Sequence, residues 1–96
     1  MARADLDPAT ASRALGVLDE LVAYQKRKVL ELAQRIHPGL TEEDVRNIHD
    51  YPDVYADPIF QYEDGQLAGL IAAQIALKAR LLGGTLAGGP PPVSTP

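Results

Sequence analysis

The spacing of apolar residues between positions 11 and 36 constrains the fold more than any other feature of the chain. Apolar side chains recur there at alternating intervals of three and four residues, as on a helix face that is buried against another helix. This predicted seam contains Leu15, Leu18, Val22, Gln25, Val29, Leu32 and Ile36. Its one polar member is Gln25. The pattern therefore predicts a long helix with a helical neighbour.

Local signals set the limits of this helix at residues 8–36. Asp7 can accept a hydrogen bond from a free backbone N–H group, and proline is favoured at the first helical position, which Pro8 occupies. At the other end, the residue before a proline is disfavoured in the helical conformation and glycine permits a chain reversal. The sequence His37-Pro38-Gly39 is therefore expected to end the helix.

A short second helix is predicted over residues 41–48. Thr41 and Asp44 have the spacing of a capping box, in which each side chain accepts a hydrogen bond from the other residue's backbone. Leu40 and Val45 flank them as a hydrophobic staple.

A third helix is predicted over residues 58–82, again beginning with an aspartate-proline pair. Small residues form one stripe along it, which another helix could approach closely: Gly65, Gly69, Ala72, Ala76 and Ala79. A bulkier leucine-rich stripe has Gln74 at its centre. We assign the small-residue stripe and Gln74 to an oligomer seam, together with the seven seam residues between positions 15 and 36 that are given above.

These elements define an all-α fold, a long–short–long helical hairpin over residues 1–82 followed by a flexible Gly/Pro-rich tail over residues 83–96. A domain of this size has a marginal core, and the chain has no cysteine with which to form disulfides. We therefore expect two copies to associate as a dimer that forms a four-helix bundle.

The charge is concentrated in the middle of the chain. Residues 41–64 contain eight acidic side chains and one arginine, a balance of −7, whereas the whole chain has a net charge of −4. Such a field would repel nucleic acid. The most apolar run, residues 67–77, is shorter than the roughly 20 residues of a membrane span. We therefore expect a cytoplasmic protein that binds neither nucleic acid nor membrane.

The acidic connector, residues 41–64, is also rich in tyrosine. Its aromatic side chains could close the end of the bundle, or the connector could be a docking surface for a basic protein. The residues of this candidate partner surface are Tyr51, Asp53, Tyr55, Asp57, Tyr62 and Glu63. The histidines and carboxylates lack the spacing of known metal sites. We expect no metal, no cofactor and no catalytic residue.

The two seam glutamines permit two interpretations. A buried amide needs a partner, so it can select one helix register and one number of helices. This interpretation fits a non-enzymatic, self-associating structural or adaptor module. Alternatively, Gln25 or Gln74 could act with basic side chains in a small helical enzyme or a binder of anionic ligands.

Two resemblances bear on these expectations. Residues 37–70 resemble a group of short bacterial cytosolic proteins of unknown function, through Leu40-Thr41-Glu42-Glu43-Asp44, Asp50-Tyr51-Pro52 and Tyr62-Glu63-Asp64-Gly65. This resemblance implies a helical fold and no activity. The chain is also similar in length and helix order to the all-helical chorismate mutases, whose dicarboxylate clamp would fall on Gln74, Arg13, Arg27 and Lys28. The paired isoleucine-aspartate pattern of their first helix is absent here.

Overall fold

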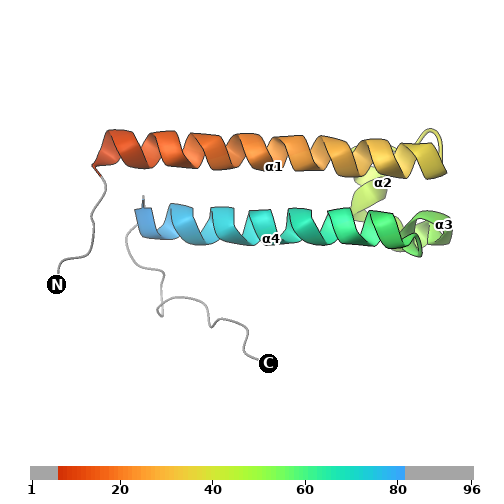
Figure 1. Cartoon of the computed structure of the whole chain (residues 1–96). Helices are drawn as coiled ribbons and strands as arrows, with labels where there is room; N and C mark the ends of the chain where they lie inside the picture. The colour runs from red at the N-terminus through yellow and green to blue at the C-terminus, as the bar shows by residue number, and fades with distance from the viewer. Residues whose placement is uncertain (1–6, 82–96) are drawn as a thin grey trace, which may run out of the picture.

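The computed structural model describes residues 7–81, which form two long antiparallel helices joined at one end by a connector (Figure 1). The long helices are α1 (Pro8–Ile36) and α4 (Pro58–Leu81). The connector contains α2 (Glu42–Arg46), a 3₁₀ turn (Ile48–Asp50) and α3 (Pro52–Tyr55). No strand occurs within residues 7–81. The predicted all-helical hairpin is confirmed, while the proposed tail and residue 82 lie outside the described residues.

The predicted signals at the ends of α1 are present in the structure. The Asp7 carboxylate accepts a hydrogen bond from the Thr10 backbone N–H at 3.2 Å, and Pro8 is the first helical residue. At the other end, the His37 N–H donates to the Ala33 carbonyl, and Gly39 has a φ of 93°. Residues that carry a side chain rarely adopt a positive φ, so the glycine at this position allows the chain to reverse.

The predicted capping box also forms. Thr41 Oγ1 accepts from the Asp44 N–H at 3.2 Å, and Asp44 Oδ2 accepts from the Thr41 N–H at 3.0 Å. Leu40 is buried and Val45 packs against the same core, as a hydrophobic staple requires.

The prediction of a single short helix over residues 41–48 was wrong. α2 ends at Arg46, and the connector continues with the 3₁₀ turn and then α3. Pro52 is the first residue of α3, for the same physical reason that applies to Pro8 and Pro58. From the sequence we predicted no helix over residues 52–55, although Pro52 carries the same signal as Pro8 and Pro58.

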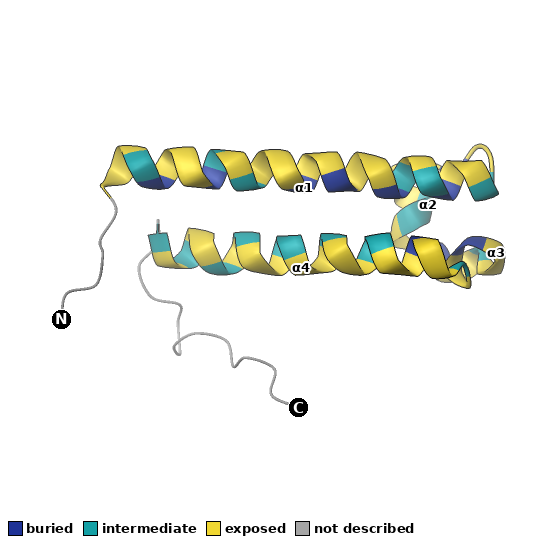
Figure 2. Cartoon of the chain, viewed as in Figure 1, coloured by how far each residue is buried: buried dark blue, intermediate teal, exposed yellow. Residues whose placement is uncertain are grey.

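The core lies at the connector end of the hairpin. It consists of Val29, Ala33, Leu40, Ile48, Val54 and Phe60, which come from α1, α4 and every part of the connector except α2. Beyond it, burial continues only along the side of α1 that faces α4, while the outward sides of both helices are exposed (Figure 2). The connector end therefore has several packed layers, whereas the open end has two helices and no third element among the described residues.

This arrangement predicts that alanine substitutions at two adjacent residues of α4 differ greatly in their effect on the free energy of unfolding. Phe60 is 1% exposed and Ile59 is 62% exposed. Because Phe60→Ala leaves a cavity in the multilayered part of the core, we expect it to lower the free energy of unfolding by about 3–5 kcal/mol. Ile59→Ala is the control and should change it by less than about 0.5 kcal/mol. Urea denaturation followed by circular dichroism measures both, and equal losses would contradict this account of the core.

Candidate functional site

A polar link crosses the middle of the hairpin. Gln25, which is 7% exposed, donates through Nε2 to the Glu63 carbonyl at 2.9 Å and to Glu63 Oε1 at 2.8 Å. Lys28 Nζ lies 3.4 Å from the other carboxylate oxygen, Glu63 Oε2. These partners, the Gln25 amide foremost, hold the pKa of Glu63 below its usual range. One residue of α4 thus satisfies the buried amide of α1 and fixes how the two helices align.

A second polar link lies nearer the open end. Gln74 Nε2 donates to Asp19 Oδ1 at 2.7 Å, and Lys78 Nζ lies 3.4 Å from the same oxygen. The hydrogen bond from Gln74, followed by the contact with Lys78, lowers the pKa of Asp19. Both seam glutamines therefore donate to a carboxylate on the opposite helix.

The two links lie on opposite sides of the hairpin. Asp19 and Lys28 are nine residues apart on α1, and at 3.6 residues per turn this separation places them about 180° apart around the helix axis. Each of them pairs with a residue of α4. The Lys28–Glu63 pair therefore marks one lateral side of the hairpin, and the Asp19–Lys78 pair marks the other.

The side marked by Lys28 becomes mainly apolar toward the open end. The residues of α1 on the stripe that leads from Lys28 to the open end are Tyr24, Leu21 and Val17, which are 55%, 47% and 58% exposed. On α4, Leu70 and Leu77 follow Glu63 at intervals of seven residues, or about two turns each. Leu70 is half-buried and Leu77 is 43% exposed. We call these five residues the apolar side.

The opposite side carries charges and a hollow. The hollow lies between α1, α2 and α4, has a volume of about 300 Å³, and has a floor that includes Val29, Val45 and Leu67. Lys26 and Asp64 are among the charged residues that line it. Burial raises the pKa of the half-buried Asp64 carboxyl. The partial burial of Asp64 was not predicted from the sequence. A signal was present, because Asp64 follows the buried Phe60 by four residues, a spacing that places both on one face of the helix.

The predicted seam of α1 faces α4 of the same chain. Leu15, Val22, Gln25 and Val29 are buried, and Leu18, Leu32 and Ile36 are half-buried. On α4 the half-buried Gln74 reaches α1, whereas Gly65, Gly69 and Ala72 are exposed and Ala76 and Ala79 are half-buried. A Cβ atom added at Gly65 or Gly69 would meet nothing within 4 Å. The small-residue stripe therefore has open space beside it.

All three acidic groups of the predicted partner surface contact other residues of the chain. Asp53 Oδ2 lies 3.0 Å from His37 Nδ1, a contact that lowers the pKa of Asp53. Asp57 caps α4 by accepting from the Phe60 N–H at 2.9 Å. Glu63 is directed toward Gln25 and Lys28, as described above.

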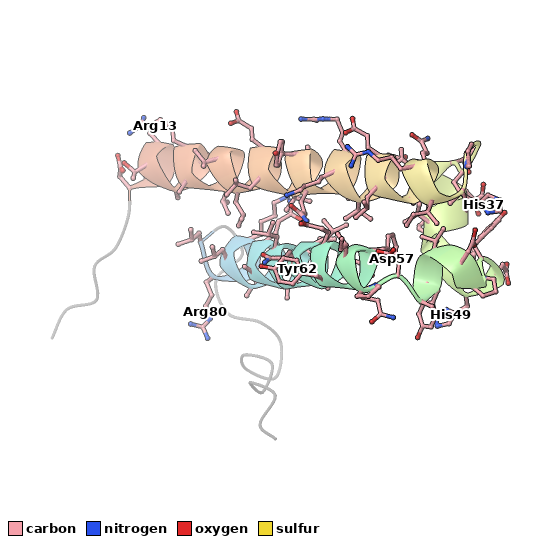
Figure 3. The ribbon with its side chains drawn as sticks, turned by 45° about the vertical axis from the view of Figure 1, so that its right-hand side comes forward. Arg13, His37, His49, Asp57, Tyr62 and Arg80 are labelled. Carbon is pink, nitrogen blue, oxygen red and sulfur yellow. The ribbon has the colours of Figure 1, made fainter. Side chains whose placement is uncertain are left out.

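The tyrosines of that surface are dispersed. The hydrogen bond with Asp44 raises the pKa of Tyr51, whose ring contacts His37 edge-on at 5.0 Å. Tyr55 lies 4.4 Å from the ring of His49, and Tyr62 is 64% exposed. Figure 3 shows Tyr62 on α4 well away from His37 and His49, which lie at the connector end. Tyr62 is therefore separated from the two tyrosines that contact the histidines.

Over residues 7–81, no cluster of three or more histidine or carboxylate side chains is arranged to hold a metal ion. Within the same range, no helix combines the length and apolar character needed to span a bilayer. Comparisons with protein-family models, with curated proteins and with solved structures find no match to this chain.

The Gln25–Glu63 link predicts a pH-dependent effect. Gln25→Leu removes the main cause of the lowered Glu63 pKa, so we expect that pKa to rise toward its ordinary range. A carboxyl whose pKa is lowered by folding stabilises the fold above its ordinary pKa, and this contribution disappears as the pH falls through the lowered value. The relative stability of the variant should therefore improve in acid. NMR titration of the Glu63 carboxyl measures the pKa, and Gln74→Leu is the control that should leave it unchanged.

The burial of Asp64 predicts an effect on stability with the opposite pH dependence. Burial penalises its charged form, so Asp64→Asn should raise the melting temperature at neutral pH. The gain should disappear at about pH 3, where the wild-type carboxyl is also neutral. The control is Asp50→Asn, which removes the same charge from an exposed position of the connector. Equal melting shifts for the two variants would attribute the effect to net charge instead of burial.

Proposed function

We propose that the chain is a non-enzymatic cytoplasmic structural module that functions as a homodimer, in which two hairpins form a four-helix bundle. The observation that carries this proposal is the exposure of large apolar side chains along both long helices. Val17, Leu21 and Leu77 are all more than 40% exposed, and all lie away from the layered core at the connector end. Exposed apolar surface that extends over two helices is typical of an association surface.

The size of the core supports this proposal. A two-helix hairpin covers only one face of each helix, and small domains reach useful stability by adding disulfides, metals or partner chains. The chain contains no cysteine. A second copy would supply two more helices of the same lengths, and helices packed in this way form the standard four-helix arrangement.

The hydrogen bonds of the glutamines weigh against the alternative of an anionic-ligand binder or enzyme. Both amide nitrogens already donate to carboxylates, and a ligand carboxylate would have to displace them. Docking of a basic protein on the connector has less support for a similar reason, because Asp53, Asp57 and Glu63 have partners within the chain.

Self-association predicts a melting temperature that depends on protein concentration, because dimerisation stabilises the folded state by mass action. Sedimentation of the full chain from about 1 to about 100 µM, a range that covers common dimer affinities, should show a dimer that becomes dominant as concentration rises. Thermal melts over the same range should shift upward by several degrees. A compact monomer with a constant melting temperature would refute the proposal.

A further inference from the structure

We infer that the second copy docks on the apolar side, against Val17, Leu21, Tyr24, Leu70 and Leu77, with the two connectors at opposite ends of the dimer. This inference rests on the proposed self-association and adds the surface and the orientation. The same five residues lie between the Lys28–Glu63 pair and the open end, where the described part of the chain covers the two helices with no further element.

The lack of charge at the centre of this side favours a second copy as the occupant. Between Lys28 and the open end, the central positions of α1 on this side are Thr10, Ala14, Val17, Leu21 and Tyr24, and those of α4 are Gln66, Leu70, Ala73 and Leu77. Arg13 and Glu20 lie at its outer edge, because each is three or four residues from Val17. A two-fold dimer places residues near its axis against their own copies, so any charge there would face a like charge. An uncharged centre avoids that repulsion, and it offers little to a partner selected by charge.

The other lateral side is less suited to self-association. Asp19 and Lys78 lie on it, and so do Lys26 and Asp64, which line the hollow. Burying these groups under a second copy would remove water from several charges at once, which is costly unless each one finds a partner. Ile75 is 61% exposed and adjoins this charged side, since it lies four residues beyond Ile71 of the hollow.

The charge distribution along the hairpin selects the orientation. Residues 41–64, with their balance of −7, occupy the connector and the adjoining end of α4. Arg13 and Arg80 lie at the open end, far from His37 and His49 (Figure 3). If the copies were parallel, the two acidic connectors would be adjacent and would repel each other. A two-fold axis across the middle of the apolar side separates them by the length of the hairpin.

Three substitutions distinguish the possible surfaces. Leu21→Lys places a charge at the centre of the apolar side, so two lysines would be buried in each dimer, and we expect the dimer dissociation constant to rise about ten-fold or more. Ile75→Lys introduces the same side chain at a more exposed position beside the charged side and should change it less than about two-fold. Gly69→Leu fills the open space beside the small-residue stripe and should also leave the dimer intact.

Circular dichroism checks that each variant stays helical, which we expect because all three positions are exposed in the single chain. Leu77→Lys repeats the test of the apolar side from α4. If the wild type is a dimer, and Ile75→Lys or Gly69→Leu dissociates it while Leu21→Lys and Leu77→Lys do not, this inference is wrong and the proposed function stands. If the wild type is monomeric, both fail.

The orientation has its own measurement. The chain lacks cysteine, so Glu43→Cys provides a unique spin-label site on an exposed residue of the connector. In the antiparallel dimer the two labels should lie about 40 Å apart or more, the length of the 29-residue helix α1 at 1.5 Å per residue. Pulsed electron paramagnetic resonance measures this distance. A separation below about 25 Å would show adjacent connectors and overturn the antiparallel arrangement, since the helix geometry leaves no other way to bring them together.

Discussion

The contact between α1 and α4 is the constraint on which the rest of the molecule depends. It buries the seam of α1 from Ala11 to Val29, and the Gln25–Glu63 link lies within it. Apolar side chains can slide past one another at modest cost, but a buried amide that loses its partner carries a large penalty. Gln25 therefore favours the one alignment in which Glu63 reaches it, and this alignment sets which other residues of α1 and α4 lie side by side.

The connector supplies the side chains that complete the core beside this helix–helix contact. Leu40, Ile48 and Val54 come from segments too short to be stable helices in isolation, yet all three are buried against α1 and Phe60. Caps at Thr41 and Asp57 satisfy backbone groups that the first turns of α2 and α4 leave free. Two of the acidic side chains of residues 41–64, Asp44 and Asp57, take part in these caps. The tightly packed end is thus the end with the strongest negative charge.

The open end has the opposite character, and this asymmetry carries the proposed function. There α1 and α4 contact each other along one face and leave Val17, Leu21 and Leu77 largely exposed. Apolar exposure at one end and negative charge at the other favour an assembly that covers the first and separates the second. An antiparallel pair of hairpins meets both conditions with a single two-fold contact.

Much of the local structure follows from the sequence, because its causes are local. Asp7-Pro8, His37-Pro38-Gly39 and the Thr41–Asp44 box act within one helical turn, so the limits of α1 and the start of α2 could be predicted. Pro52 offered the same signal for α3, and it was overlooked. The partners of Gln25 and Gln74, the burial of Asp64 and the division of the hairpin into an apolar and a charged side could not be predicted in this way. These features depend on the relative rotation and alignment of two helices far apart in sequence, and only tertiary packing determines them.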